Sequence, residues 1–394
     1  MTYHYIHIIN SLDTKYGGPP IALSSLVKAQ KKNGNKVTII STFITKKEFN
    51  SVQSDFKNLI DNNIEFILLK AFSFYRVSLK LISILIKNNH EAIFYFHGIY
   101  RWPTTIGSYI CRIKNYKYVI RLHGALDPYL FNKSVNGKVF FIFKKISEKI
   151  FDFKNLKKAM WVHVTSKNEL KKLPNYCKVN CNLKIIPNGI SLPEKNNFVD
   201  IRKKYNLNKK QKIILFLGRI SEKKGLDLLI NSYPLLNRRL KNTSLLIIGP
   251  DNENYIRELR KIIKRIDSSI SKNIIFDQKV SRSLIKSYFT QSDLFVLPSH
   301  TENFGMAVIE SIYYGTPTLV SKNVDIFQEL KKHSLLNTFE KLNPEDISNK
   351  IIDSLYDSNL KKALNQNGKN IIKKMYSWTK ISDDIQKLTN YYIN

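Results

Sequence analysis

Residues 212–225 read Lys-Ile-Ile-Leu-Phe-Leu-Gly-Arg-Ile-Ser-Glu-Lys-Lys-Gly, and an apolar run at 226–230 follows them directly. The first six residues form an almost unbroken apolar run, which is typical of a strand buried on both faces of a parallel sheet. Gly218 and Gly225 allow the chain to turn tightly before a helix begins. This order of strand, turn and helix predicts a βαβ unit, and hence a doubly wound α/β sheet in this half of the chain.

The same alternation of short apolar runs and helical stretches extends over the whole chain. Before residue 193 we expect strands at 3–9, 36–43, 64–69, 92–96, 118–122, 160–164 and 183–186. After residue 210 we expect strands at 212–217, 244–248, 274–276, 293–297 and 317–320. Because a polar stretch at 193–210 interrupts the pattern, the sequence predicts two doubly wound domains, at 1–192 and 193–375. In such sheets, ligands bind beyond the carboxyl ends of the strands.

The composition agrees with two domains and a polyanionic or phosphorylated ligand. A chain of 394 residues exceeds the size of a single core, so two domains of roughly 200 residues are expected. The 64 Lys and Arg residues outnumber the 31 Asp and Glu residues, which gives a net charge of +33. Such a charge favours polyanions, anionic lipid surfaces and phosphorylated small molecules. Lysine is abundant throughout the chain, so the charge alone does not choose among these ligands.

Cysteine use and hydropathy indicate the compartment. Cys111, Cys177 and Cys181 match no disulfide framework or zinc spacing, which indicates a reducing environment. Residues 3–9 lack the features of a signal peptide, and no apolar run approaches the ~18 residues that a membrane span needs. We therefore expect a cytoplasmic protein.

Two carboxylates bracket the start of an apolar helix at 302–310, which reads Glu-Asn-Phe-Gly-Met-Ala-Val-Ile-Glu. Glu310 lies among apolar residues, and a buried ionised carboxylate is unfavourable unless a polar group meets it. The helix that Gly305 opens offers unpaired N–H groups and a positive dipole end, which together bind phosphate. A ligand with both phosphate and hydroxyl groups suggests a nucleotide.

Two cations follow the strand 212–217. Arg219 and Lys224 lie at the strand end where a ligand would bind, but the segment is neither a P-loop nor a dinucleotide fingerprint. A solvated basic turn explains these residues about as well in a lysine-rich chain. If they bind a diphosphate, they neutralise a leaving group without a metal ion. Because the chain also lacks an Asp-x-Asp signature, we expect no metal and no other cofactor.

These residues, together with several other motifs, resemble the signature of glycosyltransferase family four. The resemblance is carried by Gly218-Arg219, Lys224-Gly225, Pro298-Ser299 and the Glu-x7-Glu spacing of Glu302 and Glu310. Further motifs in the expected order are Gly17-Gly18, His97-Gly98, Arg121-Leu122-His123-Gly124, Thr165-Ser166 and Pro187-Asn188-Gly189. The resemblance covers nearly the whole chain. Each motif is weak evidence alone, but their shared order argues against coincidence.

The resemblance implies the GT-B fold, in which two doubly wound Rossmann-like domains face a central cleft. It also implies that a C-terminal helix, 376–394, packs back on the first domain with Trp378 as an anchor. The implied activity is that of a retaining transferase whose co-substrate is a nucleotide-diphosphate sugar, either a UDP- or a GDP-sugar. Since no nucleophile is evident, we expect front-face attack in which the leaving phosphate accepts the acceptor's proton.

The resemblance also implies roles for individual residues. Arg219 and Lys224 would hold the diphosphate, Glu302 would face the transferred sugar, and Glu310 would accept hydrogen bonds from the ribose. Glycines and backbone N–H groups would complete the donor site, at Gly17, Gly18, Gly218, Phe304, Gly305 and Met306. Of these, the loop at 17–18 would close over the phosphates from the first domain.

Two histidines of the first domain are candidates for the site, and two others are not. His123 ends a strand, so we expect it to orient donor and acceptor and to take part in proton transfer, although a structural histidine at a strand end is the alternative. His97 occupies a similar strand end, and its contact with the ligand is left open. We interpret His4 and His7 as structural.

A basic region in the first domain suggests where the acceptor binds. Residues 101–184 contain 18 Lys and Arg residues and four acidic residues. Within this region, 139–156 interleaves Phe140, Phe141, Phe143 and other apolar residues with lysines, a pattern suited to an anionic membrane surface. An ordinary core-facing helix with solvated lysines is the alternative. The functional hypothesis is contact with the inner leaflet, next to a lipid-linked acceptor.

The leading hypothesis is a hexosyltransferase that acts on a glycan or lipid-linked acceptor in the assembly of bacterial lipopolysaccharide O-antigen, capsule or exopolysaccharide. A GT-B relative with epimerase or phosphorylase chemistry is the first alternative. A nucleic-acid-binding protein is the second, because of the charge and the 12% aromatic content. Against the second, no nucleic-acid recognition motif is present, and Glu302 and Glu310 would repel a phosphate backbone. The sequence names neither the base, the sugar nor the acceptor.

Overall fold

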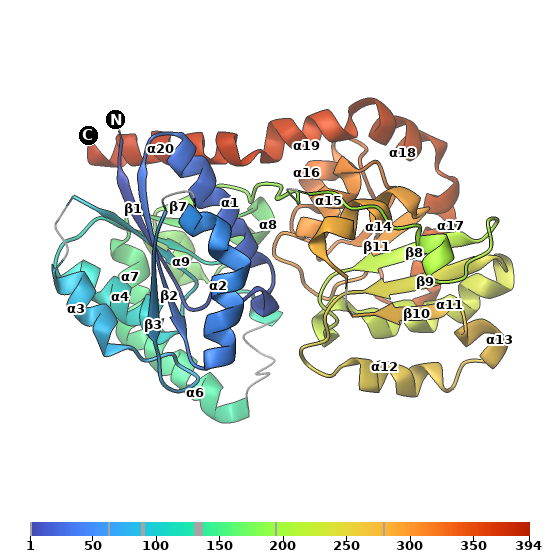
Figure 1. The fold of residues 1–394 in the computed structure, drawn as a ribbon, viewed down its shortest axis with the longest axis horizontal. Coiled ribbons are helices and arrows are strands. Elements are labelled where there is room, and N and C mark those ends of the chain that lie inside the picture. Colours follow the sequence, from blue (N-terminus) through green and yellow to red (C-terminus); the bar gives the residue numbers. More distant parts are fainter. Residues whose placement is uncertain (1, 62–63, 88–90, 130–136, 194, 279) are drawn as a thin grey trace. The chain divides into compact units, whose positions relative to one another are not determined.

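The computed structural model describes residues 2–61, 64–87, 91–129, 137–193, 195–278 and 280–394. The chain divides into two compact units, of which the first is Met1–Ser191 with Tyr376–Asn394 and the second is Leu192–Met375. In each unit, helices cover both faces of a parallel sheet (Figure 1).

The first unit is built on a seven-stranded parallel sheet with the strand order β3-β2-β1-β4-β5-β6-β7. Its strands are β1 (His4–Ile9), β2 (Lys36–Phe43), β3 (Glu65–Lys70), β4 (Ile93–His97), β5 (Tyr118–Arg121), β6 (Trp161–Val164) and β7 (Leu183–Ile185). Its helices are α1 (Gly18–Lys32), α2 (Lys46–Asp61), α3 (Leu79–Lys87), α4 (Trp102–Ile113), α6 (Gly137–Ser147), α7 (Phe153–Lys158), α8 (Lys167–Lys172), α9 (Asn175–Asn180) and α20 (Trp378–Ile393).

The second unit has a six-stranded parallel sheet with the order β10-β9-β8-β11-β12-β13. Its strands are β8 (Lys212–Leu217), β9 (Thr243–Ile248), β10 (Ile274–Asp277), β11 (Leu294–Leu297), β12 (Thr318–Ser321) and β13 (Asn337–Phe339). Its helices are α10 (Ile201–Lys204), α11 (Leu226–Arg239), α12 (Ile256–Ile263), α13 (Ser268–Ser271), α14 (Ile285–Gln291), α15 (Met306–Tyr313), α16 (Phe327–Lys331), α17 (Pro344–Tyr356), α18 (Ser358–Ala363) and α19 (Lys369–Tyr376).

The strands expected from the apolar runs are confirmed to within one residue at each end. The apolar runs form strands because both faces of each sheet are covered; every residue of β9 and β11, for example, is buried. The sequence analysis missed β13. This strand has three residues at the edge of the sheet and only Phe339 is buried, so it leaves no apolar run to find.

In both sheets the strand order reverses beside the first strand of the unit, so that later strands are added on its other side. β1 lies between β2 and β4, and β8 lies between β9 and β11. A doubly wound sheet binds its ligands beyond the carboxyl ends of the strands at this switch point. The fold therefore selects the loops that follow Ile9 and His97 in the first unit, and those that follow Leu217 and Leu297 in the second.

The C-terminal helix α20 packs on the first unit through Trp378. This side chain is buried in an apolar cluster with Tyr5 and Trp161, and its Nε1–H donates to Ser191 Oγ at 2.9 Å. A Cβ atom at Gly189 would overlap the Trp378 ring, which explains the glycine in the turn at 187–189. Trp378 is thus the packing anchor that the sequence analysis expected.

Candidate active site

In the second unit, the turn after β8 packs against the loop after β11. Gly225 has a left-handed backbone angle φ of 66°, and a Cβ atom there would overlap the carbonyl oxygen of Pro298. Only glycine lets the two loops approach this closely. The approach places the Lys224 ammonium group against the Glu302 carboxylate, and the two form an ion pair whose side chains are only 12% and 14% exposed.

Three cations surround the Glu302 carboxylate. Burial alone would raise the pKa of Glu302, but the positive charges of Lys224, Lys223 and Arg219 outweigh burial and lower this pKa to about 2. The pKa of Lys223 is also lowered, but for a lysine this shift disfavours the charged form. Burial, together with repulsion from Lys224 and Arg219, lowers the pKa of Lys223 to about 8, although Glu302 opposes the shift. The turn after β8 is therefore strongly positive, as a diphosphate site requires.

The structure thus brings Arg219, Lys224 and Glu302 together, three residues that the sequence analysis assigned to one site. Their motifs follow β8 and β11, which are neighbours in the sheet. Sequence reasoning missed Lys223. It precedes Lys224 in a lysine-rich turn, and nothing in the sequence shows that its side chain is partly buried among other charges.

Glu310 meets the polar partner that its apolar helix requires. Its side chain is only 4% exposed, and its Oε1 accepts a hydrogen bond of 2.6 Å from Arg282 Nη2. Burial raises the pKa of Glu310, while the charge of Arg282 acts in the opposite direction. Sequence reasoning missed Arg282, because it lies between β10 and α14 and matches no motif. The ribose contact of Glu310 stays a prediction.

The helix α15 begins at Met306, directly after a left-handed glycine. Gly305 has a φ of 82°, and as the N-cap residue it has no side chain that could cap the N–H groups of the first helical turn. Phe304 is buried immediately before this turn. The helix N-terminus therefore follows the same loop as Glu302, where its N–H groups and dipole suit an anion.

In the first unit, α1 starts at the glycine pair that follows β1. Gly17 has a φ of 91° and donates its N–H to the Thr14 carbonyl oxygen at 2.9 Å, and α1 begins at Gly18. The N-cap residue of this helix, Gly17, also has no capping side chain. Pro19 and Pro20 have no N–H group, so Gly18 offers the amide nearest to the helix start.

A buried ion pair supports the loop that precedes α1. Arg76 donates to Glu48 Oε1 at 2.7 Å and to the Tyr16 hydroxyl oxygen at 2.9 Å. Ser11 donates to the same Glu48 oxygen at 2.6 Å. Both ends of the loop are thereby tied to Glu48 on α2. Sequence reasoning missed this support because the contacts join residues far apart in the chain.

His123 follows β5 and is held in an uncommon backbone conformation. Its φ is 53°, in the left-handed region that non-glycine residues rarely adopt. Two contacts maintain this conformation: the Gly124 N–H donates to Glu169 Oε1 at 2.7 Å, and His123 Nε2 lies 3.0 Å from His97 Nδ1. Burial, and then the charge of Arg121, lowers the pKa of His123 well below its ordinary value, so the ring is neutral.

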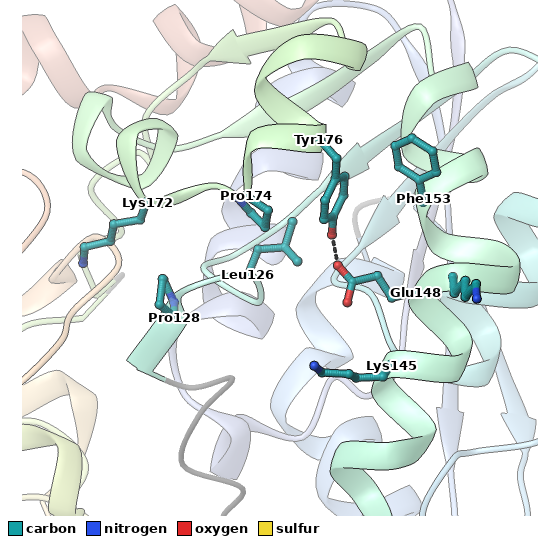
Figure 2. A pocket seen from close by; sticks show the side chains of 9 residues that line it. Leu126, Pro128, Lys145, Glu148, Phe153, Lys172, Pro174 and Tyr176 are labelled. Atoms are coloured by element: carbon teal, nitrogen blue, oxygen red, sulfur yellow. Dashed lines mark hydrogen bonds between the residues drawn. The ribbon is translucent and has the colours of Figure 1, made fainter.

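A separate cavity of about 740 Å³ lies in the first unit, and Figure 2 draws the side chains that line it. Its lining is mainly apolar, with three lysines and one acidic residue: Leu126, Pro128, Lys145, Glu148, Lys149, Phe153, Lys172, Pro174 and Tyr176. The acidic residue, Glu148, accepts a hydrogen bond from the Tyr176 hydroxyl group. Lys172 Nζ lies 3.0 Å from Asp127 Oδ2, so Lys145 and Lys149 are the lining lysines best suited to meet an external anion.

The amphipathic stretch at 139–156 forms α6, a π-helical turn (Glu148–Asp152) and the start of α7. Ile142, Ile146 and Ile150 recur every four residues and are 55%, 47% and 51% exposed. The side chains of Phe140 and Phe143, which the sequence analysis included, lie outside the described residues. The described isoleucines face solvent and not the core.

Within the described ranges, no group of three or more His, Cys, Asp or Glu side chains could hold a metal ion. Among the helices of the described residues, none is long and apolar enough to cross a bilayer.

Comparisons with known proteins support a transferase. Residues 197–371 match the family model of glycosyl transferases group 1. The chain is 24% identical to the uncharacterized glycosyltransferase MJ1178 of Methanocaldococcus jannaschii, over 85% of this chain and 86% of that protein. It is 29% identical to MJ1607 of the same organism, over 51% of this chain and about half, 52%, of that protein. It is 24% identical to the capsular polysaccharide biosynthesis glycosyltransferase CapM of Staphylococcus aureus, over 46% of each chain.

Solved structures share the fold. Sucrose-phosphate synthase from Thermosynechococcus elongatus superposes with a TM-score of 0.76 at 16% identity, over 99% of both chains. Anabaena HepE, crystallised with UDP and glucose, superposes with a TM-score of 0.73 at 15% identity, over 99% of this chain and 100% of that one.

Two doubly wound parallel sheets, with candidate ligand loops at both switch points, define a protein of the GT-B fold. The group 1 match falls within the unit that carries the cation cluster, and two of the similar proteins, MJ1178 and CapM, carry the name glycosyltransferase. The second unit is therefore similar to glycosyl transferases group 1, and the whole chain shares the fold of the solved structures.

Proposed function

We propose that the enzyme is a retaining glycosyltransferase of family four that takes a sugar from a nucleoside-diphosphate donor. The observation that carries this proposal is the cluster of Arg219, Lys223 and Lys224 around Glu302, at the carboxyl ends of β8 and β11. A diphosphate brings negative charge to this cluster, and each charge-assisted hydrogen bond contributes about 1.5–3 kcal/mol. The UDP in HepE favours a UDP-sugar, with a GDP-sugar as the alternative.

The geometry of the second unit supports a role for each donor-binding residue in this proposal. Arg219 and Lys224 bind the diphosphate together with the N–H groups at the start of α15. Glu310 keeps one oxygen on Arg282 and offers the other to the ribose hydroxyl groups. Glu302 faces the sugar, where its negative charge stabilises positive charge that develops at the anomeric carbon. The side chains supply the positive charge, so the proposal includes no metal ion.

Retention follows if attack and departure take place on the same face of the sugar. The acceptor hydroxyl oxygen bonds to the anomeric carbon while the bond from that carbon to the phosphate oxygen breaks. The departing phosphate oxygen takes the proton of the acceptor hydroxyl group. His123 orients the sugar during this step.

Thermal unfolding with a panel of UDP- and GDP-sugars tests donor binding. A donor at 100 times its dissociation constant adds about 2.7 kcal/mol to the free energy of unfolding, and Arg219→Ala should abolish the shift. Proton NMR of the product then reads the anomeric configuration. No stabilisation by any nucleotide sugar would contradict the donor site, and an inverted product would contradict retention.

We propose that the acceptor is lipid-linked and belongs to surface polysaccharide assembly, at the inner face of the membrane. The similarity to CapM supports the pathway. The exposed Ile142, Ile146 and Ile150, with lysines beside them at the cavity of Figure 2, support contact with an anionic bilayer.

Co-sedimentation with vesicles of anionic and of neutral lipid tests this contact. Binding should require anionic lipid, should weaken with salt, and should fall several-fold in an Ile142→Asn, Ile146→Asn double variant. Phe198→Asn, which removes an exposed apolar side chain of the second unit, is the matched control. Background sedimentation with anionic vesicles at low salt would exclude the proposal.

A further inference from the structure

One glutamine and three histidines form a continuous hydrogen-bonded row in the first unit. Gln30 Oε1 lies 2.7 Å from His7 Nε2, and His7 Nδ1 lies 3.0 Å from His97 Nε2. His97 Nδ1 lies 3.0 Å from His123 Nε2. The first three residues are at most 2% exposed, whereas His123 is partly exposed. The row thus crosses from α1 through β1 and β4 to the ligand edge of the sheet.

Every ring in this row is neutral near pH 7. Burial lowers the pKa of His7 to about 3, in spite of its hydrogen bond to Gln30. Burial, followed by the neighbouring rings and the charge of Arg121, lowers the pKa of His97 well below its ordinary value, as burial and Arg121 do for His123. A neutral imidazole has one N–H donor and one acceptor nitrogen.

The remaining groups that face the row do not supply a counter-charge. Tyr95 packs its ring 5.2 Å from His7 and 5.5 Å from His97, and burial raises its pKa, so it stays protonated. Burial and the charge of Arg121 lower the pKa of His163, which is therefore neutral as well. The charge on the row itself is zero.

A row of neutral rings has only two consistent arrangements, with all N–H groups directed one way or all directed the other. The structure places the carbonyl oxygen of Gln30, and not its amide nitrogen, on His7 Nε2. An oxygen can only accept, so with this amide orientation His7 carries its proton on Nε2 and accepts at Nδ1. His97 then donates its Nε2–H to His7 Nδ1 and accepts at its own Nδ1. The donor to His97 Nδ1 is His123, which therefore carries its proton on Nε2. Among the residues that the structure describes, Nδ1 of His123 has no hydrogen-bond partner, and its lone pair is left for a ligand.

We infer that Gln30, His7 and His97 are positioning residues that fix His123 as the Nε2–H tautomer, so that its Nδ1 accepts a hydrogen bond from a hydroxyl group of the bound sugar. The identity of this ligand rests on the proposed function. The opposite tautomer would present an N–H to the same hydroxyl group, which would then have to accept. The glutamine on α1 thereby selects which partner the active-site histidine recognises.

Nitrogen-15 NMR of the full-length protein labelled at histidine reads the tautomer directly, because protonated and unprotonated ring nitrogens have distinct shifts. The His123 signals are assigned by their loss in His123→Asn. In the wild type we expect an unprotonated Nδ1 and a protonated Nε2 near pH 7. Gln30→Met keeps the volume but removes the acceptor, and should convert His123 to a mixture of tautomers. Gln30→Glu retains an oxygen acceptor and should restore the wild-type pattern.

Kinetics gives the second readout. Gln30→Met should lower kcat/KM about tenfold, the effect of one neutral hydrogen bond, and Gln30→Glu should recover most of the loss. A protonated Nδ1 on His123 in the wild type overturns the inference without any variant, as does an unchanged tautomer in Gln30→Met. The expected tautomers with loss of kcat/KM support it. If no nucleotide sugar binds while the tautomers are as expected, the proposed function fails and the sugar contact fails with it, but the assignment of the row stands.

Discussion

Donor affinity should fall between pH 7 and pH 9.5, because Lys223 loses its proton in this range. Burial and the neighbouring cations lower the pKa of Lys223 from 10.5 to about 8 in the unliganded enzyme. A bound diphosphate places opposite charge beside the ammonium group, so we expect the pKa to return to about 10.5 in the complex. Linkage between these two values predicts that the dissociation constant rises about 30-fold from pH 7 to pH 9.5.

The folding equilibrium should respond to Lys223 in the opposite direction. The folded-state pKa of Lys223 lies below its unfolded value, so the unfolded chain binds more protons between pH 8 and pH 10.5. Titration of Lys223 therefore makes the free energy of unfolding increase with pH over this range. A loss of donor affinity in the same range would not arise from unfolding through this residue.

Isothermal titration calorimetry with the nucleotide sugar that stabilises the enzyme most measures the effect. Lys223→Arg is the matched control, since arginine stays protonated throughout and its dissociation constant should change by less than about threefold. A flat profile in the wild type would refute the diphosphate assignment of Lys223. An arginine variant with the full wild-type slope would show that another group titrates.

Three further predictions concern the donor site and the turn that shapes it. Arg219→Ala should lower kcat more than about tenfold while the melting temperature hardly changes, because a partly exposed side chain contributes to the site more than to packing; a large loss of melting temperature with normal turnover would contradict this role. Glu310→Gln should weaken donor binding about tenfold in calorimetry, and an unchanged affinity would count against a ribose contact. Gly225→Ala should lower the free energy of unfolding in urea by more than about 2 kcal/mol, through its left-handed backbone and the overlap with Pro298. Gly34→Ala, which is also left-handed but has its nearest atom 3.6 Å away, should cost only about 1 kcal/mol, and equal losses would exclude the overlap as the cause.

The strands were predictable because a strand that is buried on both faces consists mainly of consecutive apolar residues. β8 has its four central residues fully buried and was found at its observed bounds. β13 was missed because an edge strand of three residues needs few apolar side chains. Burial on both faces made β8 recognisable in the sequence, and the lack of it at the sheet edge hid β13.

Site residues were predictable where they belong to a motif that directly follows a strand. They were not predictable where their role depends on which side chains surround them in the folded protein. Lys224 and Glu302 meet because their strands are neighbours, which order along the chain can indicate. Arg282 reaches Glu310 from a loop that carries no motif. The altered pKa of Lys223 and the alignment of His7 with His97 both depend on which atoms surround each side chain, and no spacing in the sequence reports that.

The buried carboxylate explains how the enzyme keeps a cation cluster intact without its ligand. Arg219, Lys223 and Lys224 repel one another, and Lys223 already has its pKa lowered to about 8. The Glu302 carboxylate opposes this shift and keeps more of the ammonium groups charged at neutral pH. When a diphosphate arrives, it meets cations that are already protonated and in place, so little binding energy is spent on recharging them. Glu302 then lies beside the transferred sugar with its charge intact, because a pKa of about 2 leaves it ionised. One acid can therefore serve the empty site as a counter-ion and the reacting site as a stabiliser of positive charge.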